Sequence, residues 1–164
     1  MTVEMYKYVG KVIFERLTEL TKQEEYKEVQ LVGMSLGCMG APMTAKTYKD
    51  FDHVTLVCPG SSLAKSLWYG ERTQDLKATF EKNGMTIERL VKDWHDIEPE
   101  NNLDAFVGKK VKIIVSKKDT SIPTVYQKEY VAAAKAAGVN PKVKKSIFGH
   151  YGAIIRFCLF GKIL

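Results

Sequence analysis

The stretch VQLVGMSLG, residues 29–37, decides the fold. Its first part, 29–34, is an apolar run of the length of a buried strand, and the pattern beyond it predicts a helix from Leu36 to about Lys46. Between them, residues 33–37 match G-x-S-x-G. Where this pattern links a strand to a helix, a sharp turn lifts the serine above the sheet. We therefore expect an α/β fold with Ser35 at the turn.

Strand-like and helix-like segments alternate along the rest of the chain. Apolar residues at helical spacing predict a helix from Thr2, its N-cap, to about Tyr26. Further strands are expected at 53–58, 111–116 and 143–148, further helices at 124–137 and 151–164, and helical stretches without a strand at 61–105. This alternation is typical of a parallel sheet covered by helices on both faces. We expect a single domain, 1–164, with a sheet of about four strands and a lid-like insertion at 61–105.

The composition is that of a soluble globular protein. Of the 164 residues 45% are hydrophobic and 27% charged, and no apolar run approaches the roughly 20 residues of a membrane span. The first residues lack the pattern of a secretory signal, so a cytoplasmic location is expected. The cysteines, Cys38, Cys58 and Cys158, lie in apolar surroundings without a CxxC pair. Buried free thiols are expected, rather than disulfides or a zinc site.

The net charge of +6 is unevenly distributed. Residues 101–164 contain 12 Lys and Arg against 3 Asp and Glu. Such an excess can mark a surface for nucleic acids or anionic substrates, or it can reflect solvated ends of helices and strands. Aromatic residues do not alternate with the lysines as they do in single-strand binders. The second interpretation is therefore favoured, and no nucleic-acid partner is expected.

Ser35 needs a base to become a nucleophile, and three histidines are available. His53 opens a strand and is expected to be structural, while His95 lies in the insertion and is expected at the surface. His150 follows the last strand and precedes the last helix. In a parallel sheet that position lies on the same C-terminal edge as Ser35, where ligands of open α/β sheets bind. His150 is therefore the expected base.

The acid that orients the histidine should leave a strand at this same edge. Asp119 follows the strand 111–116, in the sequence KKDTSIP. It could instead cap the helix that follows, and the two roles are compatible. The chain order Ser35, Asp119, His150 is the order of nucleophile, acid and base in α/β-hydrolases.

These motifs resemble the α/β-hydrolase superfamily of esterase-like and lipase-like serine hydrolases. GMSLG resembles the nucleophile elbow, with Gly33, Met34 and Gly37 around the serine, and FGHYGAI (148–154) resembles the histidine loop. The resemblance covers nearly the whole chain and corresponds to the C-terminal part of the fold, from the helix before the elbow onward. It implies that the Leu36 amide is one donor of an oxyanion hole.

The resemblance also implies elements that this sequence lacks. Family members carry four more strands before the first helix, including the loop that supplies the second oxyanion donor. The strand 29–34 is therefore expected to be an open edge. Three explanations of the missing elements are open. The chain is a truncated or split enzyme, a homodimer or partner chain covers that edge, or the protein is a small variant with a rebuilt oxyanion site.

The function expected from these residues is hydrolysis of a carboxylic ester or thioester, with a small acyl ester as the substrate. Acyl transfer and a non-catalytic binding or assembly module are the alternatives. Trp68, Tyr69 and Trp94 in the insertion are candidates to line an acyl pocket, or to pack the insertion onto the core. No cofactor and no metal are expected, because phosphate-binding glycine motifs are absent and the cluster of Asp93, His95 and Asp96 fits no standard spacing.

Overall fold

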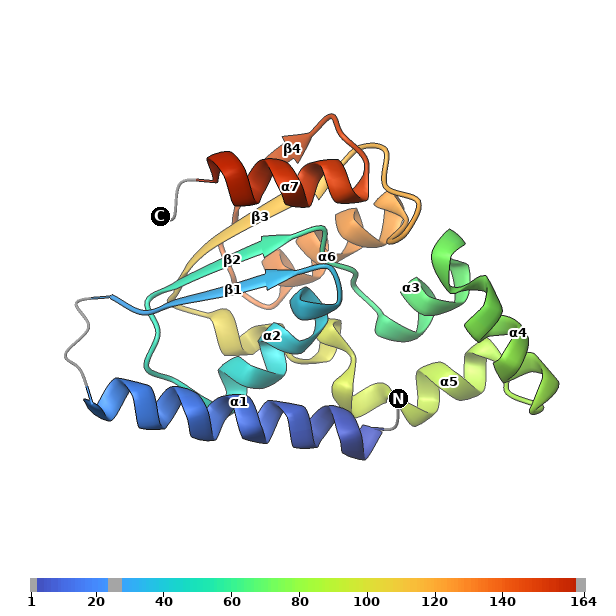
Figure 1. Cartoon of the computed structure of the whole chain (residues 1–164), viewed down its shortest axis with the longest axis horizontal. Coiled ribbons are helices and arrows are strands. Elements are labelled where there is room, and N and C mark those ends of the chain that lie inside the picture. Colours follow the sequence, from blue (N-terminus) through green and yellow to red (C-terminus); the bar gives the residue numbers. More distant parts are fainter. Residues whose placement is uncertain (1–2, 24–27, 162–164) are drawn as a thin grey trace.

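The computed structural model describes residues 3–23 and 28–161, and it contains a parallel sheet with helices on both faces (Figure 1). The strands are β1 (Gln30–Met34), β2 (His53–Val57), β3 (Lys110–Ser116) and β4 (Lys142–Ser146). The α-helices are α1 (Val3–Gln23), α2 (Leu36–Thr47), α3 (Leu63–Tyr69), α4 (Gln74–Lys82), α5 (Ile87–Asp93), α6 (Thr124–Ala136) and α7 (His150–Phe160). Short 3-10 helices are η1 (Glu71–Thr73), η2 (His95–Ile97), η3 (Pro99–Asn101) and η4 (Leu103–Phe106). The fold class and the order of elements predicted from the sequence are confirmed.

The strands pair in the order β1-β2-β3-β4, and every pair is parallel. Met34 at the end of β1 pairs with Val57 at the end of β2, and Ser116 at the end of β3 pairs with Ser146 at the end of β4. The segments that leave the four strands therefore emerge on one edge of the sheet, which is where open α/β folds place their sites.

The larger core lies on the face covered by α2 and α6. Residues of β2 and β3 alternate in direction, so that one set of side chains enters this core and the other faces α7. The core residues with the least exposure are Cys38, Ala45, Val54, Leu56, Leu103, Phe106, Ile113, Tyr130 and Ala134. Gly138, with φ of 84°, ends α6 as the sequence predicted.

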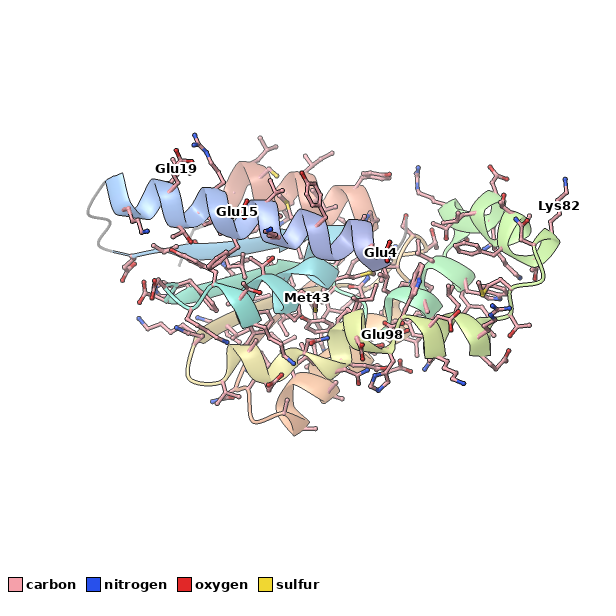
Figure 2. All side chains as sticks on the ribbon, turned by 90° about the horizontal axis from the view of Figure 1, so that it is seen from below. Glu4, Glu15, Glu19, Met43, Lys82 and Glu98 are labelled. Carbon is pink, nitrogen blue, oxygen red and sulfur yellow. The ribbon has the colours of Figure 1, made fainter. Side chains whose placement is uncertain are left out.

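Helix α1 packs on the outside of α2 through Phe14 and Leu17, which are partly buried against the same core. Figure 2 shows the molecule from this side, with Glu15 and Glu19 on α1. Two of the apolar residues at helical spacing that predict this helix, Ile13 and Leu20, are nevertheless exposed by 42% and 36%. Thr2 and the predicted end of the helix at 24–26 lie outside the described residues. No helix within the described ranges is long and apolar enough to cross a membrane.

The opposite face of the sheet is covered by α7. Val57 and Cys58 pack there against Ala153, with Ile114 beside them. Cys158 is exposed, whereas Cys38 and Cys58 are buried, so the expectation of three buried thiols is wrong for Cys158. The reason is that α7 contacts the sheet along only one side.

Strand β4 ends at Ser146, two residues earlier than expected. The chain turns there because the Phe148 amide donates a hydrogen bond to the Ser146 hydroxyl at 3.2 Å. The Ser116 hydroxyl then donates to the Phe148 carbonyl at 2.6 Å. These bonds bring His150 into the first turn of α7, rather than into the preceding loop.

Strand β1 lies at one end of the sheet and, within the described residues, pairs with β2 alone. Its side chains Val32 and Met34 are exposed by 40% and 37%. The open edge predicted for 29–34 is therefore present in the described part of the chain.

Residues 61–105 contain helices and no strand, as predicted. Their apolar side chains form a separate cluster that includes Leu63, Trp68, Leu90, Trp94 and Ile97. Glu98, which is 1% exposed, connects the last part of this segment to its beginning. Its carboxylate accepts hydrogen bonds from the Leu63 and Ala64 amides at the start of α3 and from the Ser62 hydroxyl. Burial raises the pKa of Glu98, against the effect of these three hydrogen bonds.

We expect Glu98→Ala to lower the free energy of unfolding by about 2–3 kcal/mol, because buried donors that lose their acceptor cost about 1–3 kcal/mol. Glu98→Gln keeps one acceptor oxygen and should cost less. Glu81→Ala, at an exposed position in the same segment, is the control and should stay within about 0.5 kcal/mol. Urea unfolding measures all three, and equal values for Glu98→Ala and Glu81→Ala would contradict the anchoring role of Glu98.

Candidate active site

Ser35 occupies a strained turn between β1 and α2. Its backbone angles are φ 52° and ψ −121°, a conformation that costs a non-glycine residue about 1–3 kcal/mol. The Ser35 amide donates to the Val57 carbonyl of β2 at 2.9 Å, and its carbonyl accepts from the Cys38 amide at 2.9 Å. These bonds fix the serine on the C-terminal edge of the sheet, as the G-x-S-x-G pattern predicted.

Gly33 allows α2 to lie against β1 at backbone distance. A Cβ atom at Gly33 would lie 2.9 Å from the Cys38 Cα and 2.9 Å from the Gly37 carbonyl oxygen. The Cys38 thiol also donates to the carbonyls of Gly33 and Val57, each at 3.1 Å. Gly37 differs, because a Cβ atom there would meet nothing within 4 Å. Of the two glycines of the G-x-S-x-G pattern, only Gly33 is required for the close packing of α2 on β1.

Ser35, His150 and Asp119 form one hydrogen-bonded chain. His150 Nε2 lies 2.8 Å from Ser35 Oγ, and His150 Nδ1 lies 2.7 Å from Asp119 Oδ2. An ionised carboxylate accepts only, so Nδ1 carries the imidazole proton and Nε2 is left to accept from the serine hydroxyl. His150 is 8% exposed and Asp119 5%. The structure thus brings together the three residues that the sequence singled out, in the tautomer that a general base needs.

Both carboxylate oxygens of Asp119 accept hydrogen bonds. Its Oδ1 accepts the Ser121 and Ile122 amides at 3.0 and 2.9 Å, and its Oδ2 accepts the Gln127 side-chain amide at 2.8 Å in addition to His150. Burial raises the pKa of Asp119, but the hydrogen bonds from His150 and the Ile122 amide bring it below its usual value. The carboxylate therefore stays ionised and oriented.

Gln127 is a site residue that sequence reasoning missed. It is completely buried on α6, and its Oε1 also accepts the Ser116 amide at 2.9 Å. It therefore ties the loop 117–123, which carries Asp119 and is called the acid loop below, to the end of β3. The sequence signal that could have found it is a glutamine within the predicted helix 124–137, which follows Asp119.

The other histidines lie elsewhere. His53 opens β2, far along the strand from the C-terminal edge, and is 4% exposed. His95 is exposed in η2, with Nδ1 3.3 Å from the Asp96 carboxylate. Both positions agree with the sequence expectation.

Cys58 lies beside Asp119 and His150. It follows β2 with φ of 56°, and burial together with the charge of Asp119 raises the pKa of its thiol far above the usual value. Cys58, Asp119 and His150 each offer a ligand atom, all within 4.8 Å of one another, so this group could hold a metal ion. Both His150 nitrogens already face Ser35 and Asp119, so such a metal would have to displace one of those hydrogen bonds.

A cavity of about 240 Å³ opens beside the serine. Its lining residues are Ser35, Leu36, Met39, Ser66, Leu67, Arg72, Thr73, Ser121, Ile122, His150 and Tyr151. Leu36 begins α2, so its amide lacks an intrahelical acceptor and can donate to an oxyanion next to the serine.

The aromatic residues expected to line this cavity do not reach it. Trp68 and Trp94 are each 7% exposed and belong to the apolar cluster of the insertion. Tyr69 is half exposed, with its ring 6.3 Å from that of Tyr126. The large rings are needed to pack the insertion onto the core, and smaller residues of the same segment line the cavity instead.

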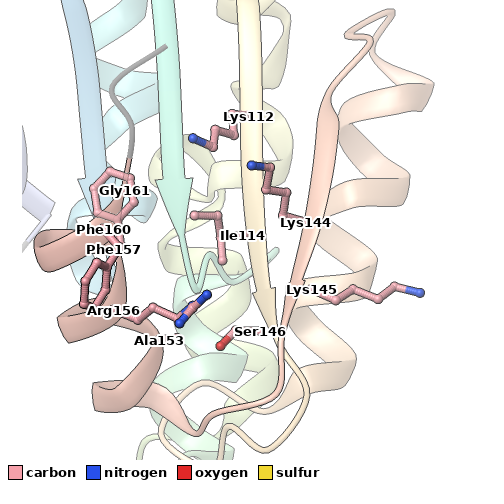
Figure 3. Close-up of a pocket in the computed structure, with 10 residues that line it drawn as sticks. All are labelled: Lys112, Ile114, Lys144, Lys145, Ser146, Ala153, Arg156, Phe157, Phe160 and Gly161. Carbon is pink, nitrogen blue, oxygen red and sulfur yellow. The ribbon is translucent and has the colours of Figure 1, made fainter.

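A second cavity, of about 380 Å³, lies between α7 and the strands β3 and β4 (Figure 3). Lys112 and Lys144 point into it from neighbouring strands, and Arg156 approaches from α7. Burial and the charges of Lys144 and Lys142 lower the pKa of Lys112. Lys144, in the middle of β4, is exposed, but Lys112 is only 4% exposed. Part of the basic excess is therefore gathered on this face, away from Ser35.

Comparisons with solved structures reveal similar folds. The Pyrococcus horikoshii acylaminoacyl peptidase has a TM-score of 0.67 at 16% identity, over 90% of this chain and 25% of the peptidase. The Pyrococcus furiosus esterase Pf2001 has a TM-score of 0.62 at 15% identity, over 90% of this chain and 54% of the esterase. A Mycobacterium tuberculosis puromycin-hydrolyzing peptidase has a TM-score of 0.59 at 14% identity, over 77% of this chain and 20% of that one.

The chain therefore has a partial α/β-hydrolase fold. It spans about a quarter of the acylaminoacyl peptidase and about half of the esterase. No protein-family model matches the sequence, and no curated protein matches it.

The two glycines of the elbow offer a matched pair of variants. Gly33→Ala forces the α2 backbone away from β1, and we expect it to destabilise the fold by more than 1 kcal/mol and to abolish any reactivity of Ser35. Gly37→Ala meets open space inside a helix, where alanine is favoured over glycine by about 0.5–1 kcal/mol. Thermal unfolding of both variants tests this difference. Equal stability of the two would show that the close approach at Gly33 is not required.

Proposed function

We propose that this chain carries the catalytic centre of a serine hydrolase that cleaves a carboxylic ester or thioester through an acyl-serine intermediate. The observation that carries the proposal is the hydrogen-bonded chain from Ser35 through His150 to Asp119, with distances of 2.8 and 2.7 Å. A serine on a strained turn, a correctly protonated imidazole and a buried carboxylate are together the requirements of nucleophilic acyl transfer.

The proposed reaction has two halves. Ser35 Oγ attacks the acyl carbon while His150 Nε2 takes the hydroxyl proton, and Asp119 stabilises the imidazolium that forms. The imidazolium then gives its proton to the leaving alkoxide or thiolate as the bond from the acyl carbon breaks. Water repeats the sequence on the acyl-serine, losing its proton to His150, and releases the acid.

The oxyanion that forms in each half needs hydrogen-bond donors. The Leu36 amide, at the start of α2, is the donor that the described residues supply beside Ser35. Missing one of two donors costs about 3 kcal/mol, or on the order of a hundredfold in rate. Esters and thioesters are intrinsically more reactive than amides and tolerate this loss better, which favours them over peptides as substrates. We propose that a homodimer partner or another chain covers the open edge of β1.

A non-catalytic assembly module is the second candidate function, and the open edge of β1 is the observation that favours it. In that case the exposed edge pairs with another chain, and the Ser35–His150 pair takes no part. An acyltransferase would use the same acyl-serine with a different acceptor.

Treatment with a fluorescent fluorophosphonate tests the proposal, because such probes label serines that a base activates. We expect labelling of the wild type, no labelling of Ser35→Ala, and rates lowered by about 10³–10⁴-fold in His150→Ala and Asp119→Asn. Ser66→Ala removes another serine of the same cavity and should label like the wild type. A folded wild type that does not label, or labelling that survives Ser35→Ala, would favour the assembly module.

A further inference from the structure

Arg72 gives the cavity beside Ser35 a positive charge that the proposed acyl chemistry does not use. Apart from His150, it is the single cationic side chain among the described residues that line the cavity, and none of these residues carries a carboxylate. Its side chain is exposed, and no described carboxylate lies within ion-pair distance of it. A cation that lines a small cavity without a carboxylate partner is suited to receive an anion.

The backbone that carries Arg72 is fixed to the acid loop. The amide of Glu71 donates to the Thr120 carbonyl at 3.0 Å, beside Asp119. The Thr73 hydroxyl donates to the Leu67 carbonyl at 2.6 Å. A Cβ atom at Gly70 would lie 2.4 Å from the Ser121 carbonyl oxygen, so this turn lies against the acid loop at backbone distance. Arg72 is therefore positioned relative to the site, although it belongs to the insertion.

The guanidinium of Arg72 also packs against an aromatic ring. Arg72 Cζ lies 4.5 Å from the centroid of the Tyr151 ring, and that ring meets the His150 imidazole edge to face at 5.4 Å between centroids. Stacking on an aromatic face uses the flat side of a guanidinium and leaves its N–H edge free to bind a carboxylate through two parallel hydrogen bonds. Arg72 thus contacts Tyr151, and Tyr151 contacts His150. An anion bound to Arg72 would be separated from the proposed base by these two ring contacts.

We propose that Arg72 is a specificity-determining residue, and that the substrate is a short acyl ester or thioester with a free carboxylate. The inference rests on the proposed function and names its substrate class. One arginine matches the single charge of a carboxylate, whereas a phosphate dianion requires further donors. The remaining lining, with Leu36, Met39, Leu67 and Ile122, is apolar and suits a short carbon chain between the two polar ends.

Two matched pairs of esters test this, because the carboxylate can lie on the acyl side or on the leaving-group side. Mono-4-nitrophenyl glutarate is compared with 4-nitrophenyl pentanoate, and 4-acetoxybenzoate with its methyl ester. We expect the wild type to prefer the charged member of one pair in kcat/KM. Arg72→Gln should lower that value by about 10–100-fold, the range for charge-assisted hydrogen bonds, and change the neutral ester by less than about threefold.

Two further variants separate charge recognition from packing. Arg72→Lys keeps the charge without the two-pronged geometry and should retain part of the preference. Arg89→Gln, which removes an exposed arginine from α5 in the same insertion, should leave both pairs unchanged. If Arg72→Gln lowers the charged and neutral esters equally, or neither, Arg72 only packs the insertion against α7 and the inference is overturned.

A binding measurement keeps the test independent of turnover. NMR titration of Ser35→Ala with glutarate should show saturable binding that is lost in Ser35→Ala/Arg72→Gln. If glutarate binds but the wild type is not labelled by the fluorophosphonate and hydrolyses no ester, the carboxylate site is supported and the hydrolase proposal fails. Hydrolysis in which the charged esters, like the neutral ones, show no dependence on Arg72, or the absence of glutarate binding, would overturn the inference and leave the hydrolase proposal intact.

Discussion

Parallel pairing of the four strands is the constraint on which the rest of the structure depends. Met34 pairs with Val57, Val57 with Ile114, and Ser116 with Ser146, so the four strands end at the same edge, within two residues of one another in register. The chain positions of Ser35, Asp119 and His150 are far apart, yet each follows the end of a strand. A sheet with one strand reversed would send one of these residues to the opposite edge. Strand direction therefore assembles the site before any side-chain contact is made.

Local strain and close packing then refine the positions of the side chains. Ser35 and Cys58 both have positive φ, at the ends of neighbouring strands. These conformations cost free energy that the buried hydrogen bonds around Val57 and Ile114 offset. The glycine at 33 lets α2 begin directly behind the serine, so its first amide lies next to Ser35. The same contacts that hold the fold together at this edge hold Ser35 in place.

The features that could be predicted from the sequence are those that depend on the pattern of apolar residues and on the order of elements along the chain. Strand–helix alternation gave the fold class, and residues that follow strands gave the three members of the hydrogen-bonded chain. The sequence did not predict contacts that depend on packing between distant segments. For Trp68 and Trp94 it left open whether they line the cavity or pack the insertion, and the structure shows the packing. Gln127 and Arg72 carry no motif, and their roles follow from where α6 and η1 lie against the acid loop.

The central claim is that the Ser35–His150–Asp119 chain makes Ser35 a nucleophile. Acid quenching shortly after mixing with 4-nitrophenyl acetate, followed by peptide mass mapping, tests it most directly because it locates the covalent bond. We expect one acetyl group on the peptide that contains Ser35, and none on that peptide in His150→Ala quenched at the same time. Acetyl groups confined to lysines, or acetylation of Ser35 at the same rate without His150, would contradict it.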